Sequence, residues 1–317
     1  MRTFTAFLAA AAITFSLSCN RAAPESSGTP KIAMVVKTLN HPFFVDMRRG
    51  AQEAADRLGV RLEVQAAERE IDVEKQMQIV ENMLQTGIQA LIIAPSGSRE
   101  IVSALVKARD ARIPVVIVDT RIDEAAATAA GVHAETFVGS DNYEGGRLAG
   151  AHMVKATAGK ARVGILEGIP GHETGDSRLR GFRDAVKDAA GITIVASQPA
   201  NWERDQGFNV FQNMLQAHPD IDAVFAASDL MALGAVEAIA AAGKTGKIRV
   251  VGFDALDDAK KAIAGGSMDA SVAQFPAEMG RVAVESAVKV IRGEKLPPNT
   301  MVKLEMVTKD SLAAKQE

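Results

Sequence analysis

The sequence is poor in cysteine and in aromatic residues. Its single cysteine, Cys19, cannot form a disulfide within the chain. Aromatic residues make up 4% of the 317 residues, with one tryptophan and one tyrosine among them. The chain also lacks an excess of either charge, because 36 lysines and arginines nearly balance 39 aspartates and glutamates. No basic face therefore points to nucleic acid as a partner.

The apolar run at the start of the chain, residues 4–17, is too short to span a bilayer, which takes roughly 20 residues. One positive charge precedes it, and small residues and Cys19 follow it, as in an export signal. We expect residues 1–19 to be a lipoprotein signal with Cys19 as the acylated residue, and residues 20–30 to be a flexible polar tether. Simple secretion is the alternative, because Ser16 stands where lipoprotein signals usually have leucine.

From Lys31 onward, short β-branched or apolar runs alternate with longer segments of helical period. This alternation predicts parallel sheets with helices on both faces. The first helical segment shows the period, because Phe44, Met47 and Ala51 recur at three- and four-residue steps before Gly59 stops the helix. The predicted strands are KIAMVV, RLEVQA, ALIIAP, PVVIVD, TFVGS, ARVGILEG, ITIVAS, AVFAAS, IRVVGFD and ASVAQ.

So many strands are unusual in one continuous sheet, and a chain of 317 residues is long for one core. We divide the strands near residues 138–142 and expect the last helix and the MVKLEMV strand to return across the junction. The prediction is an α/β protein of two doubly wound, Rossmann-like lobes joined by a multi-strand hinge. The N-terminal lobe comprises residues 31–140 and 275–303, and the C-terminal lobe comprises residues 141–274 and 304–317.

Ligands of open parallel sheets bind beyond the carboxyl ends of the strands, where loops and helix N-termini converge. The residues that follow the predicted strands are His41, Phe43, Phe44, Asp119, Arg121, Arg178, Trp202, Ser228, Phe253, Asp254 and Gln274. This set combines flat apolar faces with carboxylates, guanidinium groups and an amide. Such a combination suits a ring with apolar C–H faces and an equator of hydroxyls, so the sequence predicts a site for a small neutral sugar or polyol.

Each candidate also has a structural explanation. Phe44 could begin the buried stripe of the first helix, and Asp119, Arg178 and Asp254 could form structural ion pairs or helix caps. Asp229, which opens a predicted helix, is expected to be an N-cap. The common placement of the candidates favours ligand binding, because hydrogen bonds to charged groups contribute about 1.5 to 3 kcal/mol each.

Two glycine-containing segments do not match nucleotide-binding motifs. AIAAAGKT has Ala238 where a phosphate-binding loop needs its first glycine, so we interpret it as a helix end. ILEGIPGHETGDSR lacks G-x-G-x-x-G, and its glycines are expected to let the chain turn tightly beside a ligand. The five histidines are scattered, and His172 with Glu173 is too sparse for a metal site. We expect no metal, no cofactor and no enzymatic activity.

The assembled residues give the chain a close resemblance to the periplasmic ribose-binding-protein family, type I periplasmic binding proteins that serve ABC importers. The stretches that carry it match in order and spacing: TLNHPFF, VVIVDTR, SDNYEGGRLAG, GDSRLRGF, ASQPANW, FAASDLMALGA, VVGFD and AQFP. The resemblance implies that a sugar lies between Phe43, Phe44 and Trp202. It also implies that the sugar hydroxyls are bound by Asp119, Arg178, Asp254 and Gln274.

Four positions depart from the family's ribose receptors. Those receptors have asparagine at the positions of His41, Ala94 and Ser228, and arginine at that of Thr120, for which Arg121 is expected to substitute. Polar mismatches discriminate strongly between related ligands. A pentose, a hexose, a polyol and a cyclitol therefore all remain open.

The resemblance implies a monomeric receptor that closes about its hinge on the ligand and delivers it to a membrane permease. It implies a periplasmic or cell-surface location, where the lipid anchor expected at Cys19 would hold the protein to the membrane. A chemotaxis or signalling receptor would bind in the same way. A repressor would need an N-terminal helix-turn-helix where the export signal stands, and a dehydrogenase would need the glycine fingerprint that is missing.

Overall fold

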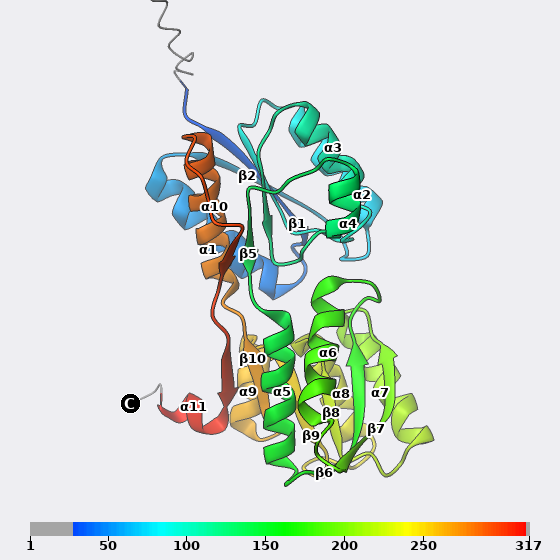
Figure 1. Cartoon of the computed structure of the whole chain (residues 1–317). Coiled ribbons are helices and arrows are strands. Elements are labelled where there is room, and N and C mark those ends of the chain that lie inside the picture. The colour runs from blue at the N-terminus through cyan, green and yellow to red at the C-terminus, as the bar shows by residue number, and fades with distance from the viewer. Residues whose placement is uncertain (1–27, 315–317) are drawn as a thin grey trace, which may run out of the picture.

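The structure, a computed structural model, describes residues 28–314 and consists of two lobes, each built around one six-stranded sheet (Figure 1). The strand order is β11-β5-β4-β3-β1-β2 in the N-lobe and β12-β10-β9-β8-β6-β7 in the C-lobe. The strands pair in parallel, with the exception of β12, which is antiparallel to β10. The prediction of two α/β lobes with parallel sheets is confirmed.

The N-lobe sheet is covered by helices on both faces. Its strands are β1 (Lys31–Thr38), β2 (Arg61–Ala67), β3 (Ala90–Ile93), β4 (Val115–Val118), β5 (Thr136–Gly139) and β11 (Asn299–Met301). Its helices are α1 (Pro42–Leu58), α2 (Val73–Leu84), α3 (Val102–Asp110), α4 (Glu124–Ala129) and α10 (Pro276–Ile291). Along β1, Ile32, Met34 and Val36 pack with α1 and α10, whereas Ala33 and Val35 pack with α2 and α3. Both faces are buried, which is why β1 is almost continuously apolar.

The C-lobe repeats this layered plan. Its strands are β6 (Lys160–Glu167), β7 (Gly191–Pro199), β8 (Ala223–Ala226), β9 (Arg249–Asp254), β10 (Ala270–Ala273) and β12 (Glu305–Thr308). Its helices are α5 (Asn142–Ala156), α6 (Glu173–Val186), α7 (Arg204–Ala217), α8 (Asp229–Ala241), α9 (Asp257–Gly265) and α11 (Lys309–Ala314). Phe225 of β8 stacks on Phe182 of α6 with ring centroids 4.4 Å apart, while Val224 packs on the opposite face with residues of α7 and α8. The core of each lobe therefore lies on both sides of its sheet.

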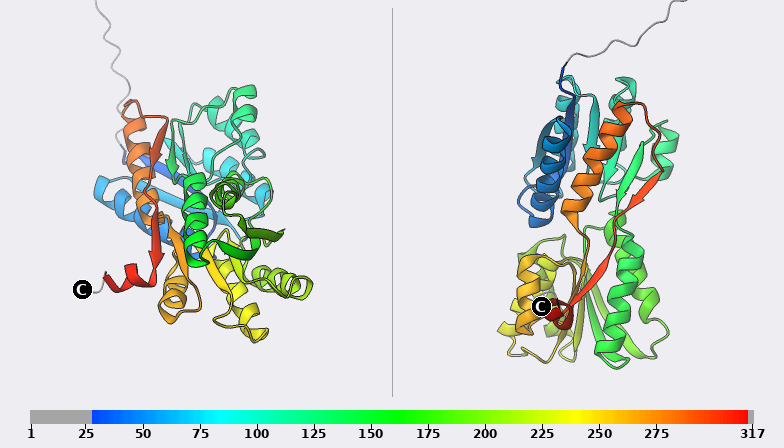
Figure 2. Two further views of the ribbon diagram at one scale, coloured as in Figure 1. Left: turned by 60° about the horizontal axis from the view of Figure 1, so that its bottom comes forward. Right: turned by 90° about the vertical axis from the view of Figure 1, so that its left-hand side faces the viewer.

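The chain crosses between the lobes after β5, after β10 and after β11, as the side view shows (Figure 2). The predicted MVKLEMV strand is divided by the last crossing, because β11 pairs with β5 and β12 pairs with β10. Residues 302–304 link the two strands. The lobe boundaries predicted after residues 140, 274 and 303 fall within these crossings, and we retain them as proposed boundaries.

The predicted helix ends follow from glycine. Gly59, at φ 66°, caps the C-terminus of α1 in the left-handed region, which glycine adopts without steric cost. Gly243, at φ 65°, follows α8 in the same way. The predicted signal segment and Cys19 lie outside the described residues. Among the described helices, none is both long enough and apolar enough to cross a bilayer.

Candidate functional site

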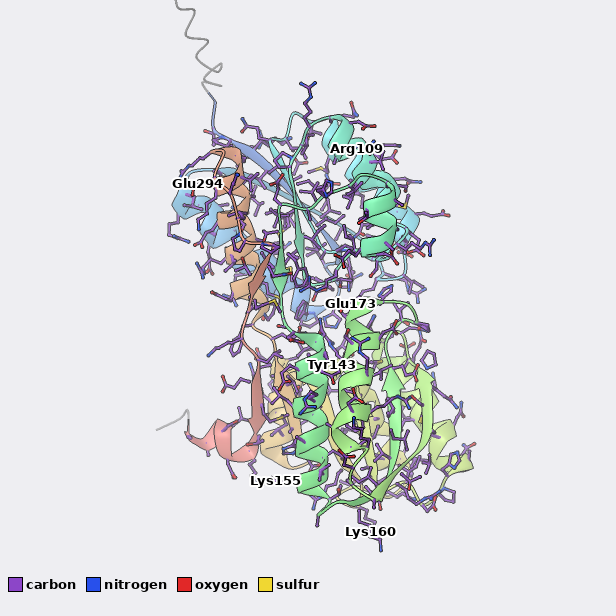
Figure 3. All side chains as sticks on the ribbon, in the orientation of Figure 1. Arg109, Tyr143, Lys155, Lys160, Glu173 and Glu294 are labelled. Carbon is purple, nitrogen blue, oxygen red and sulfur yellow. The ribbon has the colours of Figure 1, made fainter. Side chains whose placement is uncertain are left out.

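A cavity of about 310 Å³ lies between the two lobes, at the carboxyl ends of strands from both sheets. Its lining residues are Lys37, His41, Phe43, Phe44, Glu70, Asp119, Thr174, Arg178, Trp202, Asp254 and Gln274, and we call it the interlobe cavity. Glu173, the first residue of α6, lies on the side of the C-lobe that faces the N-lobe, whereas Lys155 and Lys160 lie at the opposite end (Figure 3).

Phe43 and Phe44 at the start of α1 form an aromatic wall. Both are buried, and their rings meet edge to face with centroids 5.2 Å apart. His41 caps the helix, because its Nδ1 accepts a hydrogen bond of 3.1 Å from the Phe43 N–H. Burial lowers the pKa of His41. The neutral ring that accepts at Nδ1 carries its proton on Nε2, which can therefore donate a hydrogen bond.

A buried lysine and two carboxylates form the acidic side of the N-lobe site. Lys37, 3% exposed near the end of β1, has its Nζ 3.4 Å from Asp119 Oδ2 and 3.7 Å from Glu70 Oε2. Asp119 Oδ2 also accepts a hydrogen bond of 2.8 Å from the Thr120 hydroxyl. Burial raises the pKa of Glu70 to about 7, against the opposing effect of Lys37. Glu70 therefore carries only part of its charge at neutral pH.

Arg178 and Asp254 form the corresponding group in the C-lobe. The Arg178 Nε donates to Asn142 Oδ1 at 2.9 Å and its Nη1 donates to the Ala227 carbonyl at 2.7 Å. Asp254 Oδ1 lies 3.7 Å from Arg178 Nη1 and accepts a hydrogen bond of 2.6 Å from Gln274 Nε2. Burial raises the pKa of Asp254, while Arg178 opposes that rise. These bonds fix the position of the guanidinium group.

Three residues of the interlobe cavity have positive φ: Asp119 at 66°, Trp202 at 68° and Asp254 at 109°. Side-chain-bearing residues rarely adopt such angles, and those that do cluster at functional sites. Gly168 makes room for one of them, because a Cβ there would lie 1.9 Å from Trp202 Cζ2. The glycine-rich segment thus allows the indole to lie against the backbone.

Eight of the eleven predicted site residues line the interlobe cavity, and Arg121, Ser228 and Phe253 do not. The Arg121 guanidinium stacks on the Phe137 ring at 3.8 Å and donates to Asn299 Oδ1 at 2.8 Å. Ser228 is the buried N-cap of α8 without a side-chain cap bond. The fully buried Phe253 lies under the Arg178 guanidinium at 3.8 Å and so supports a lining residue from below.

The prediction that Asp229 is a helix cap was wrong. Its Oδ2 accepts a hydrogen bond of 2.7 Å from the Leu256 N–H, and its Oδ1 accepts one of 2.7 Å from the Ser271 hydroxyl. Burial raises the pKa of Asp229 well above its ordinary value. Asp229 thus holds the turn that follows Asp254, the last residue of β9.

Sequence reasoning missed Lys37, Glu70 and Thr174. The lysine was visible as the one charge that ends the apolar run KIAMVVK, and Glu70 follows RLEVQA, a predicted strand whose end was not searched. Thr174 lies one helical turn before Arg178 on α6, so it shares a face with a predicted residue.

Comparison with known proteins places the chain in a family. A sequence profile described as "Periplasmic binding protein domain" matches residues 32–295. The chain belongs to the periplasmic binding protein family. It is 38% identical to the ribose import binding protein RbsB of Escherichia coli (strain K12) over 309 residues, which are 98% of this chain and 99% of RbsB. It is also 38% identical to the D-allose-binding periplasmic protein of that organism over 283 residues, covering 87% and 91% of the two chains.

A solved structure shows the same architecture. An ABC transporter periplasmic solute binding protein from Actinobacillus succinogenes, with bound D-allose, superimposes with a TM-score of 0.85 at 38% identity. The match covers 90% of this chain and all of the other. The resemblance and the type I periplasmic binding protein fold predicted from the sequence are thereby confirmed. The roles of the individual cavity residues in ligand binding remain predictions.

Proposed function

We propose that this chain is an extracytoplasmic solute receptor that binds a small neutral sugar or polyol in the interlobe cavity. The observation that carries the proposal is the meeting of aromatic faces and polar groups from both lobes around one small cavity. The ribose- and allose-binding names of its relatives support the same ligand class. The ligand would pass from the closed receptor to the permease of an ABC importer.

The charges around the cavity favour a neutral ligand. Lys37 and Arg178 face Asp119 and Asp254, and Glu70 is only partly ionised at neutral pH because its pKa is raised to about 7. A charged ligand would add a buried charge without a partner, which is costly. A hydroxyl can instead donate to a carboxylate and accept from an ammonium or guanidinium group, so neighbouring hydroxyls match these pairs.

The aromatic residues supply the remaining contact surface. Phe43 and Phe44 come from the N-lobe and Trp202 comes from the C-lobe. Their faces match the apolar C–H faces of a sugar ring, and burying that surface is favourable. A ligand can contact the aromatic residues of both lobes at once only when the lobes are close.

This division of the site between two lobes gives the mechanism. Neither lobe alone presents all eleven lining residues, so the closed arrangement offers a ligand contacts that an open one lacks. A ligand shifts a conformational equilibrium only through such a difference in affinity. Hinge closure of periplasmic binding proteins is a standard example of this behaviour. We propose that the three interlobe crossings form the hinge.

A thermal-shift panel tests the proposed function, because a ligand that binds only the folded state raises the melting temperature. The panel contains neutral pentoses, hexoses, polyols and inositols, with D-glucuronate and D-glucosamine as charged comparators. We expect stabilisation by at least one neutral compound and a smaller effect from its charged counterparts. Stabilisation by the charged compounds alone, or by none, would contradict the proposal.

The remaining properties are proposals of the same kind. We propose that the receptor is monomeric, that it lies in the periplasm or on the cell surface with an anchor at Cys19, and that it has no catalytic activity. Recovery of the bound sugar unchanged after prolonged incubation would support the last point. Conversion of the sugar by the purified protein would contradict it.

A further inference from the structure

An ion pair between Arg69 and Glu203 joins the two lobes beside the interlobe cavity. Arg69 lies in the loop between β2 and α2, and Glu203 directly precedes α7. The Arg69 Nη2 donates to Glu203 Oε1 at 2.7 Å, and its Nε donates to the same oxygen at 3.2 Å. The other arginine–carboxylate ion pairs found between residues 28 and 314 each join two residues of one lobe.

The pair stands at the mouth of the interlobe cavity. Its sequence neighbours on the two lobes, Glu70 and Trp202, line that cavity. Together with Arg69 and Glu203, these neighbours also line a second hollow of about 660 Å³, which shares His41 with the cavity. The Arg69 side chain is 53% exposed and that of Glu203 is 29% exposed, so the hollow opens to solvent. We call this hollow the mouth pocket.

Both partners are held in place by their own lobes. The Arg69 N–H donates to Asp72 Oδ2 at 3.0 Å, and the Asp72 N–H donates to the Arg69 carbonyl at 3.1 Å. On the other lobe, Glu203 Oε2 accepts from Gln206 Nε2, and Gln206 Oε1 accepts from Asn201 Nδ2 at 2.7 Å. Exposed ion pairs are weak partly because long side chains lose freedom when they meet. The bond from Gln206 reduces that loss for the Glu203 side chain, whereas the backbone bonds at Arg69 fix only the loop that carries the arginine.

We propose that Arg69 and Glu203 act as a closure-determining pair, which stabilises the closed lobes and slows release of the ligand without touching it. The proposal rests on the proposed function. Hinge opening separates Arg69 from Glu203, whereas the pairs Lys37–Asp119 and Arg178–Asp254 lie within single lobes and persist. The Arg69–Glu203 interaction therefore belongs to the closed state alone, and such interactions shift the equilibrium toward closure.

The lone tryptophan provides the readout for release, because Trp202 lines the cavity and its fluorescence is expected to change when a ligand enters or leaves. D-Allose and D-ribose serve as probes in stopped-flow measurements on Arg69→Ala, Glu203→Ala and the double variant. Exposed ion pairs are weak, so release should accelerate by up to about fivefold. The two single substitutions should be non-additive, and the exchange Arg69→Glu with Glu203→Arg should recover most of the wild-type rate.

The matched control is the pair Arg204–Glu237. Arg204 Nη2 and Nε donate to Glu237 Oε1 at 2.6 and 3.0 Å, so the geometry resembles that of the Arg69–Glu203 pair. Arg204 also lines the mouth pocket, but both partners belong to the C-lobe. The double variant Arg204→Ala with Glu237→Ala should release the probes at the wild-type rate.

Small-angle X-ray scattering of the unliganded protein tests the pair independently of any sugar. The Arg69→Ala/Glu203→Ala variant should have a larger radius of gyration than the wild type, and 1 M salt should bring the two closer. If the wild type binds neither probe, the compound that stabilises it in the thermal-shift panel replaces them, and the scattering tests the pair without any ligand. If the Arg69 and Glu203 variants release a probe as slowly as the wild type, this inference is overturned. If no probe binds, identical scattering of the double variant and the wild type overturns it.

Discussion

Replacing Asp254 with asparagine separates the role of this side chain in ligand binding from its role in stability. Asp254 ends β9, and its Oδ1 accepts a hydrogen bond of 2.6 Å from Gln274 Nε2. Asparagine has nearly the same shape and can accept that bond through its own Oδ1. The substitution therefore removes one negative charge and one acceptor oxygen from the interlobe cavity.

The substitution should affect the stability of the unliganded protein and its affinity for the ligand in opposite directions. Burial raises the pKa of Asp254, so the ionised carboxylate is less stable in the folded cavity than in water. Its neutral replacement should leave the melting temperature of the unliganded protein unchanged or raise it, because Arg178 keeps its bonds to Asn142 and Ala227. Ligand affinity should fall by about 10- to 150-fold, since a hydrogen bond to a charged group contributes about 1.5 to 3 kcal/mol.

Thermal unfolding with and without the sugar found in the panel measures both effects, and titration calorimetry measures the affinity. Asp258→Asn is the control, because Asp258 lies on the surface of α9 and pairs with Lys261 at 3.0 Å. That control should keep the wild-type ligand response. An Asp254→Asn variant that melts earlier without ligand, yet is stabilised by the sugar as much as the wild type, would refute a binding role for Asp254.

Two further substitutions test the acidic side and the indole of the interlobe cavity. The pKa of Glu70 is raised from 4.5 to about 7, so the folded state binds more protons than the unfolded state between these values. The contribution of Glu70 to stability should therefore be largest below pH 4.5 and fall as the pH rises to 7. Melting curves across this range should show a smaller decline for Glu70→Gln, and an equal decline would contradict the assignment. Gly168→Ala should displace the Trp202 ring and so weaken sugar binding at least about tenfold, or about 1.4 kcal/mol, as measured by calorimetry. Gly265→Ala is the control and should keep the wild-type affinity, because its added Cβ meets open space.

The sequence was sufficient to predict the fold and most of the cavity because both depend on repetitive patterns. Alternating apolar strands and helical periods determine which segments pair, and parallel pairing brings the ends of distant strands to one edge. Asp119 and Asp254, 135 positions apart by their numbering, therefore reach the same cavity from different lobes. Gln274 joins them because it follows a predicted strand as well.

The differences between the predicted and the observed positions come from local geometry that depends on tertiary contacts. Arg121 follows Asp119 by two positions, but the left-handed turn at Asp119 is followed by packing of Arg121 on Phe137. Asp229 has the residue type of a helix cap, yet it is the first residue inside α8, and its two oxygens accept from the Leu256 N–H and the Ser271 hydroxyl. Side-chain bonds of this kind join segments far apart in the sequence, and no periodicity encodes them.

The same contacts explain how the cavity retains an unfavourable backbone conformation. Asp254 and Ala255 both have positive φ, at 109° and 51°, which costs free energy for residues with a Cβ. The next residue, Leu256, donates its N–H to the buried Asp229, and Ser271 donates to Asp229 while accepting from the Ala255 N–H. Residues from α8 and β10 thus hold the turn that carries Asp254 and fix the position of its carboxylate. In the proposed site, an acceptor fixed in this way would lose little freedom on binding, which would favour affinity for a small, rigid ring.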